Sequence, residues 1–189
     1  MNDKETRTLD ISRLELRDNS NENFIGQISG YVVVFNQPSD NLSGFVEYIE
    51  PRAFDGIDLS NIVALYAHDV ASVLGRTSAN TLQLSIDDIG LRFVLNLPDT
   101  TVGHDVYTNV KAGNLRGMSF GFTVAQDSWA RSPDGTPQRT ITQIGNFYEI
   151  SVVALPAYPE TSIMVTRAIS KINHSDYKAK VLAILKTYE

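Results

Sequence analysis

Cysteine is absent from the 189 residues of this chain. Disulfides, thiolate metal sites and a cysteine nucleophile are therefore excluded. The chain also lacks an apolar stretch approaching the roughly 20 residues that a membrane-spanning helix needs. Its first residues, Met1 to Arg7, are polar and contain no signal-peptide hydrophobic region. These absences predict a soluble protein of a reducing intracellular compartment that has no membrane partner.

Histidine and positive charge are both scarce. The only histidines are His68, His104 and His174, and the formal net charge is −6. Neither a His-Glu-x-x-His metal motif nor a Gly-x-x-x-x-Gly-Lys-Ser/Thr phosphate loop is present, so no metal or cofactor is expected. The acidic balance argues against a nucleic-acid partner, because such binding depends on lysine and arginine to neutralise phosphates. An oligonucleotide-binding barrel would also need a basic face with exposed aromatic residues.

The bulk composition is that of an ordinary globular protein, with 42% hydrophobic and 20% charged residues. The length fits one domain with a proper core. A shift towards a more polar, helical pattern occurs near Arg167. We therefore predict one domain over residues 1–166 and a helical C-terminal tail over residues 167–189.

Runs of β-branched, aromatic and aliphatic residues predict strands along most of the chain. They span residues 24–35, 45–50, 62–67, 74–77, 81–86, 91–97, 118–124, 139–144 and 147–155. One helix is predicted after residue 100, because Val102, Val106 and Val110 recur at helical spacing and Gly113 supplies a stop signal. The segment 128–137 is typical of a polar loop. Many short strands with few helices predict a mostly β, α+β fold, either a barrel or a sandwich.

Ser119 is the first residue that could carry chemistry. It begins a predicted strand and lies between Gly117 and Gly121, which leave room for a substrate backbone to approach. A serine nucleophile needs an imidazole base and a third group that orients the base. The alternative is a small residue at a tight strand start.

His68 is the natural base, because it stands where an apolar strand ends and its side chain can enter a cleft. A surface histidine at a strand-to-loop transition is the alternative. Asp69 is a poor orienter for its neighbour, since adjacent strand residues point to opposite faces. We expect Asp69 to anchor the loop. His104 and His174 are expected at the surface.

Glu149 is the unusual acid, because its neighbours in the run Phe147 to Leu155 are apolar or aromatic apart from one serine. A carboxylate buried there needs a partner, since an unpaired buried charge is costly. A histidine nitrogen is one candidate partner. Arg116 or Arg76 would serve equally well in a structural ion pair.

The segment Gly117-Met118-Ser119-Phe120-Gly121 formally matches the Gly-x-Ser-x-Gly elbow of α/β-hydrolases. That elbow turns from a strand into a helix. Here the predicted order is helix and then strand, so we reject the α/β-hydrolase fold.

Taken in order, six segments of the chain resemble the prohead proteases of HK97-like tailed phages. The segments are Pro51-Arg52-Ala53-Phe54, Leu65-Tyr66-Ala67-His68-Asp69, Leu74-Gly75-Arg76-Thr77, Gly90-Leu91-Arg92-Phe93, Gly113 to Phe122, and Glu149 to Val153 followed by Pro156-Ala157-Tyr158-Pro159. The resemblance covers residues 28 to 166. This family is similar in fold to herpesvirus assembly proteases, which use Ser-His-His on a β-barrel wrapped by helices. The resemblance therefore implies a closed β-barrel flanked by a few helices.

For the site, the resemblance implies Ser119 as nucleophile, His68 as base and Glu149 as orienter. It implies a serine endopeptidase that cleaves scaffold or capsid protein segments, and itself, by an acyl-enzyme mechanism. Such an enzyme would act in the host bacterial cytoplasm, inside the assembling prohead. The tail would be a self-cleavage or scaffold-docking segment, and a homodimer is left open. The alternative is a non-catalytic capsid-assembly or scaffold protein that keeps the same barrel.

Overall fold

The computed structural model describes residues 3–10, 14–17 and 23–154. Within these residues the chain forms ten strands, one α-helix and two short 3-10 turns. The elements are β1 (Glu5–Asp10), β2 (Glu15–Arg17), β3 (Phe24–Val34), β4 (Val46–Ile49), η1 (Pro51–Phe54), β5 (Val63–Tyr66), β6 (Asp69–Arg76), η2 (Thr77–Ala79), β7 (Leu82–Ile86), β8 (Gly90–Pro98), α1 (Thr101–Lys111), β9 (Gly117–Arg131) and β10 (Pro137–Val153). The predicted mostly β, α+β class is confirmed.

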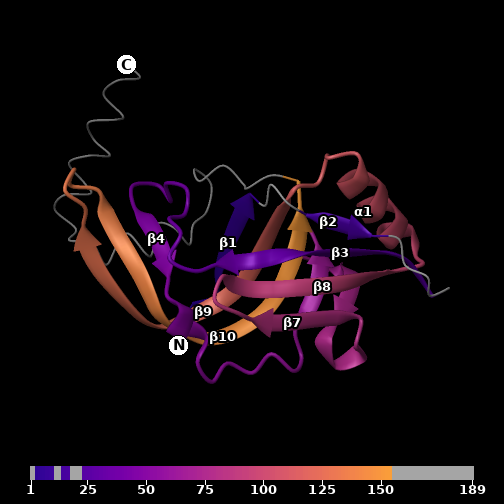
Figure 1. Ribbon diagram of the computed structural model, residues 1–189, viewed down its shortest axis with the longest axis horizontal. Coiled ribbons are helices and arrows are strands. Elements are labelled where there is room, and N and C mark those ends of the chain that lie inside the picture. Colours follow the sequence, from indigo (N-terminus) through magenta and orange to yellow (C-terminus); the bar gives the residue numbers. More distant parts are fainter. Residues whose placement is uncertain (1–2, 11–13, 18–22, 155–189) are drawn as a thin grey trace, which may run out of the picture. The chain divides into compact units, whose positions relative to one another are not determined.

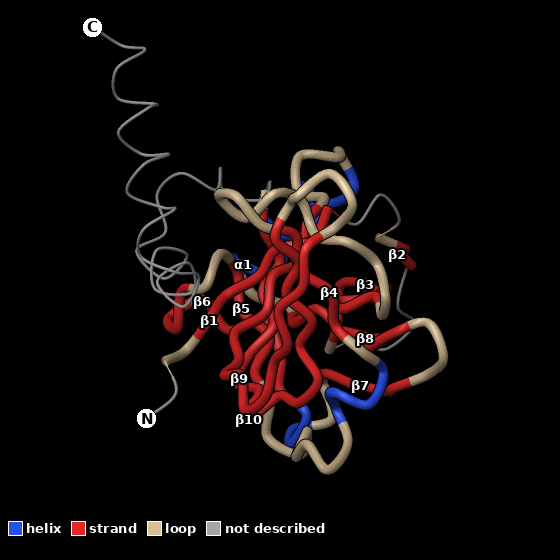
Figure 2. The backbone as a smooth tube through the Cα atoms, turned by 90° about the vertical axis from the view of Figure 1, so that its left-hand side faces the viewer, coloured by secondary structure: helices blue, strands red, loops and turns tan. Residues whose placement is uncertain are grey.

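The strands of the described part form two separate sheets, so the closed barrel expected from the resemblance is not found. One sheet has the order β1-β9-β10-β5-β6, with β4 pairing in parallel to β10, and the other has the order β2-β3-β8-β7. Figure 1 shows β3, β7 and β8 lying together, and Figure 2 shows β9 and β10 running side by side along their length. The six-stranded sheet carries all the predicted site residues.

The main core takes side chains from both sheets. Alternate residues of β9, namely Met118, Phe120 and Phe122, are almost fully buried in it. They meet the apolar residues of β8, such as Phe93 and Leu95, in the same cluster. Since strand side chains alternate between faces, Ser119 and Gly121 belong to the opposite face of β9. The sequence pattern therefore places the serine away from the main core.

The predicted helix forms as α1, which begins one residue after the Thr100 cap. The Thr100 hydroxyl accepts a hydrogen bond from the Gly103 amide at 3.1 Å, which satisfies one of the free donors of the first turn. Val106 is buried in the core. Among the described residues, the helical segments fall short of the length and apolar content that a membrane-spanning helix needs.

Two predictions about β9 and β10 were wrong in extent. The predicted polar loop 128–137 is largely strand, with only residues 132–136 left between the two strands. The predicted strands 139–144 and 147–155 are one continuous strand, β10, with register shifts along its pairing with β9. The predicted tail 167–189 lies outside the described residues, as does His174, so the domain division stays a prediction.

A buried cluster of charges fastens β1 to the rest of the six-stranded sheet. Arg7 of β1 binds both carboxylate oxygens of Glu47, at 2.6 and 2.8 Å, and it also contacts Glu5. Arg139 of β10 binds Glu5 at 2.7 Å, Glu47 at 3.0 Å and Asp127 at 2.7 Å. Arg7, Glu47 and Arg139 are all buried. Because each arginine meets more than one carboxylate, the cluster is a network rather than a set of isolated pairs.

The lowered pKa of Glu5 makes the stability that this network contributes depend on pH. Burial acts to raise the pKa of Glu5, but hydrogen bonding to Arg139 and the charges of Arg7 and Arg139 outweigh it and hold that pKa below its ordinary value. The unfolded chain therefore binds a proton at Glu5 more readily than the folded chain does. The stability that Glu5 contributes is complete above its ordinary pKa and is lost as the pH falls through the lowered one.

We expect Glu5→Gln to cost most stability at neutral pH and progressively less in acid. Urea unfolding of both proteins at several pH values between 7 and 3 measures the difference. Arg7 and Arg139 keep their charge across this range, and Glu47 and Asp127 are present in both proteins, so the comparison isolates Glu5. A difference that stayed constant across the range would contradict the prediction.

Candidate active site

His68 occupies the turn of a tight hairpin between β5 and β6. Tyr66 pairs with Asp69, so Ala67 and His68 are the two turn residues, with φ values of 52° and 62°. Both values lie in the left-handed region, which type I′ hairpin turns require and which glycine and asparagine normally supply. Side chains other than glycine pay roughly 1 kcal/mol or more there. The turn must therefore be held by contacts elsewhere.

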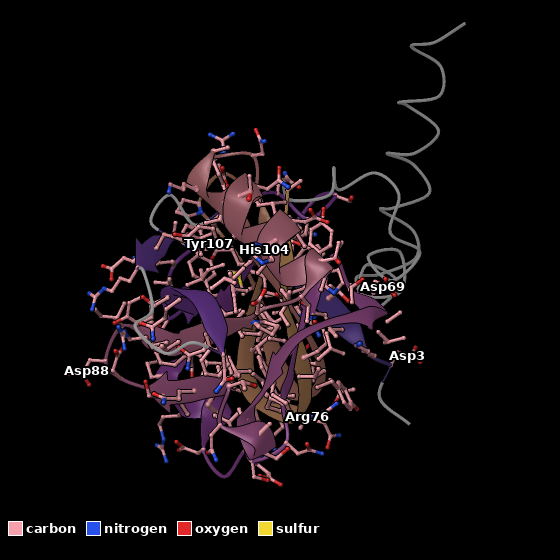
Figure 3. The ribbon with its side chains drawn as sticks, turned by 90° about the vertical axis from the view of Figure 1, so that its right-hand side faces the viewer. Asp3, Asp69, Arg76, Asp88, His104 and Tyr107 are labelled. Atoms are coloured by element: carbon pink, nitrogen blue, oxygen red, sulfur yellow. The ribbon has the colours of Figure 1, made fainter. Side chains whose placement is uncertain are left out.

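Strand β10 supplies those contacts. The Ala67 amide donates to the Val152 carbonyl at 3.0 Å, and the His68 amide donates to the Ser151 hydroxyl at 3.2 Å. Asp69 fixes the following residues, because its carboxylate accepts hydrogen bonds from the Ala71 amide and the Ser72 hydroxyl. The segment after His68, expected to be a loop, is strand β6, so Asp69 braces the start of a strand rather than a loop. Asp69 and Arg76 mark the two ends of β6 in Figure 3.

Ala67→Gly should stabilise the protein by about 1 kcal/mol, because glycine adopts the left-handed region without a Cβ penalty. The matched control is Ala71→Gly, two residues into β6, where glycine has no such advantage and should be neutral or destabilising. Chemical denaturation of both variants measures the difference. Equal destabilisation by the two substitutions would show that the turn is not strained.

His68 and Glu149 are in direct contact. The Nδ1 atom of His68 lies 2.9 Å from Oε1 of Glu149. The Glu149 side chain is 4% exposed, whereas the His68 side chain is 36% exposed. A carboxylate oxygen can only accept here, so Nδ1 carries the hydrogen and the other ring nitrogen, Nε2, is the acceptor of the neutral ring.

The other oxygen of Glu149 is held by a residue that the sequence analysis missed. The Ser151 hydroxyl donates to Oε2 of Glu149 at 2.7 Å, and the same hydroxyl accepts the His68 amide hydrogen bond. Ser151 is fully buried. Its spacing of two residues from Glu149 on one strand places both side chains on one face, and this was the signal that could have found it. Ser151 thus fixes both the carboxylate and the backbone of the histidine.

The Glu149 side chain also explains why residue 121 is a glycine. These two residues are paired across β9 and β10, and a Cβ atom built on Gly121 would lie 2.7 Å from Oε1 of Glu149 and 2.5 Å from Cε of Lys4. The glycine therefore makes room for the carboxylate and the Lys4 side chain. Arg116 and Arg76, the alternative partners of Glu149, lie elsewhere: Arg116 is exposed and Arg76 binds Asn61.

Ser119 lies one strand away from this pair. It is directly opposite Ser151 in the pairing of β9 with β10, so the two hydroxyl side chains share a face of the sheet. The side chain is fully buried. Its hydroxyl donates to the Arg7 carbonyl at 2.8 Å and accepts from the Thr8 hydroxyl at 3.1 Å, both on β1. Among the described residues, no hydrogen bond joins Ser119 to His68.

The second of the two described histidines does not belong to this site. His104 is on α1, as Figure 3 shows, and its Nε2 lies 2.8 Å from Oδ1 of Asp99. Both side chains are more than half exposed. The expected surface position of His104 is confirmed, and the histidine that meets a buried acid is His68.

A serine, a histidine and a buried carboxylate on one sheet are the groups that a serine peptidase uses. The family model of the caudovirus prohead serine proteases matches residues 12–175, and the chain belongs to this family. It is accordingly a serine protease of phage prohead maturation. The expected family and enzyme class are confirmed.

No curated protein matches the chain. Among solved structures, the bacteriophage T4 capsid assembly protease is similar with a TM-score of 0.47 and 10% sequence identity, over 79% of this chain and 98% of that one.

Proposed function

We propose that Ser119, His68 and Glu149 form the catalytic triad of this protease, and that it cleaves scaffold or capsid protein segments inside the assembling prohead. The contact between His68 Nδ1 and Glu149 Oε1 is the observation that carries the proposal. It fixes the tautomer of the imidazole and leaves Nε2 as the nitrogen that can accept a proton. The non-catalytic scaffold alternative has no such use for a buried carboxylate bound to a half-exposed histidine.

The proposed reaction is acyl transfer. His68 takes the proton of the Ser119 hydroxyl as the oxygen attacks a peptide carbonyl, and the Glu149 carboxylate stabilises the imidazolium that results. The leaving amine then takes that proton, and water hydrolyses the acyl-enzyme. We propose main-chain amides near Ser119 or after Leu155 as the oxyanion donors, and the residues after 154 lie outside the described part. The reaction requires Ser119 to exchange its present bond to the Arg7 carbonyl for one to His68.

A fluorophosphonate probe tests the nucleophile. The Ser119 oxygen would form a bond to phosphorus, fluoride would leave, and the hydroxyl proton would pass to His68. Tandem mass spectrometry should find the phosphonyl group on Ser119, and His68→Ala should slow labelling at least about a hundredfold. Label found on another hydroxyl, such as that of the buried neighbour Ser151, would refute the assignment.

Ser151 is a positioning residue in this scheme. Ser151→Ala should lower kcat about tenfold with little change in KM, because it frees one oxygen of Glu149 and removes the acceptor of the His68 amide. Ser151→Thr, which keeps the hydroxyl, should recover part of the rate. A change in the acid limb of the pH–rate profile would separate this role from a loss of folded protein. An unchanged kcat would show that Ser151 has no such role.

The substrate and assembly predictions rest on the family. The major capsid protein or scaffold of the same phage is the proposed substrate, and processing of the tail beyond Arg167 is the proposed self-cleavage. Mass spectrometry of the purified chain before and after incubation would show whether the tail shortens. The homodimer stays a prediction that sedimentation can test.

A further inference from the structure

Strand β1 occupies the contacts with β9 and Ser119 that a bound peptide substrate would need to make. It pairs antiparallel with β9 over Gly117 to Phe122, and Thr8 is directly opposite Ser119. The Arg7 carbonyl accepts a hydrogen bond from the Ser119 hydroxyl at 2.8 Å, and the Thr8 hydroxyl donates one to the Ser119 oxygen at 3.1 Å. The proton that must pass to His68 is thus engaged by β1, and so is a lone pair of the attacking oxygen.

The residue before β1 reaches a second member of the triad. The Lys4 ammonium lies 3.9 Å from Oε1 of Glu149, the oxygen that also contacts His68. Lys4 also lies over the ring of Tyr148, 5.7 Å from its centroid. A cation at this oxygen competes with the imidazole for the same negative charge. The segment from Lys4 to Thr8 therefore engages both Ser119 and Glu149.

We propose that β1 is an inhibitory strand, which occupies the edge of β9 where an extended peptide substrate binds, and which must leave before Ser119 can react. The proposal rests on the proposed function of Ser119. In the sheet order β1-β9-β10, the departure of β1 turns β9 into an edge strand with free backbone donors and acceptors. An extended peptide can add to such an edge by main-chain hydrogen bonds. A carbonyl of that peptide would then lie beside Ser119, where the Arg7 carbonyl lies now.

The position of β1 relative to the family match supports this role. The family model begins at residue 12, whereas β1 ends at Asp10. The strand that engages the nucleophile thus lies outside the segment that the family model matches. A part of the catalytic framework itself would be expected inside that segment.

The attachment of β1 is of a kind that can be released. Its buried anchors are charges, Arg7 on Glu47 and Glu5 on Arg139, together with the Arg7 guanidinium over the ring of Phe122. Buried ion pairs have a small net free energy, because desolvation offsets most of the attraction. When β1 leaves as a whole, its charges return to water and recover that desolvation penalty, so a competing strand that brings its own backbone hydrogen bonds can displace it.

The test compares two double variants of the full-length chain. Glu5→Gln/Arg7→Gln neutralises the anchors of β1 while Glu47 keeps its contact with Arg139. The control, Glu15→Gln/Arg17→Gln, makes the same two replacements in the exposed ion pair of β2. Fluorophosphonate labelling of Ser119 gives the rate, and hydrogen exchange of the amides of residues 5–10 reports whether β1 has left. We expect the first variant to lose amide protection in β1 and to label at least about tenfold faster, and the control to stay within about twofold of the parent.

Each other outcome has a definite meaning. If β1 loses protection and labelling is unchanged or slower, β1 is a structural strand and the proposal is wrong. If β1 stays protected, the ion pairs do not hold it and the proposal is equally wrong. Should the double variant not fold, Glu5→Gln alone leaves Arg7 paired with Glu47 and is judged by the same two readouts. If Ser119 is labelled in none of the proteins, the proposed function has failed, whereas labelling of Ser119 at one rate in all of them rejects only the inhibitory strand.

Discussion

Ser119→Ala is expected to lower the hydrolysis of capsid or scaffold segments by at least about a thousandfold. Removing a nucleophile abolishes the acyl-enzyme route, and what remains is the smaller contribution of binding and electrostatic stabilisation. The variant should stay folded, because the loss is one buried hydroxyl and its bonds to Arg7 and Thr8. Co-expression with the capsid protein of the same phage, followed by mass spectrometry of the products, measures the effect.

Thr8→Ala is the matched control for this experiment. It removes a hydroxyl from the cross-strand partner of Ser119, and so disturbs the same hydrogen bonds without removing the nucleophile. This variant should process the substrate at least as fast as the parent. Normal processing by Ser119→Ala would overturn the proposed triad.

Arg139→Met should destabilise the fold by about 3–5 kcal/mol, the usual cost of breaking a buried ion network from one side. The Arg139 side chain is 3% exposed and binds three carboxylates, those of Glu5, Glu47 and Asp127. Methionine fills much of the space but leaves these acids without that cation, and only Glu5 and Glu47 retain Arg7. Urea unfolding at neutral pH measures the loss.

Arg17→Met provides the comparison. Its ion pair with Glu15 is long, at 3.4 Å, and both side chains are well exposed. Such pairs contribute about 0–1 kcal/mol. A loss in Arg139→Met as small as that in Arg17→Met would mean that the buried network does little to hold the sheet together.

The sequence predicted the elements whose apolar pattern is regular. Helix α1 was found from its valine spacing, and runs of β-branched, aromatic and aliphatic residues predicted strands β3, β4, β5, β7 and β8. Strand β1 was missed because its sequence, Glu-Thr-Arg-Thr-Leu-Asp, has no apolar pattern. It is held by the buried Arg7 and the partly buried Glu5, whose partners come from β4 and β10, far along the chain. The local sequence does not show which residues these charges will meet in the folded protein.

The candidate site was also predicted only in part, because the local sequence shows that Glu149 needs a partner but not which residue supplies it. The apolar neighbours of Glu149 required a partner for its carboxylate, and the structure supplies His68 rather than Arg116 or Arg76. That choice depends on the pairing of β5 with β10, a tertiary contact that the local sequence does not determine. The left-handed turn at Ala67 and His68 was also hidden, because neither residue is one that normally marks such a turn.

The fluorescence of the single tryptophan of the chain depends on the nearby charge network. The Trp129 ring packs against Phe45, with centroids 5.2 Å apart, and lies beneath the guanidinium of Arg139 at 5.9 Å. Any rearrangement of Arg139 when β1 detaches changes the charge above the indole. Intrinsic fluorescence should therefore follow the departure of the strand in real time, with no added dye and no engineered label.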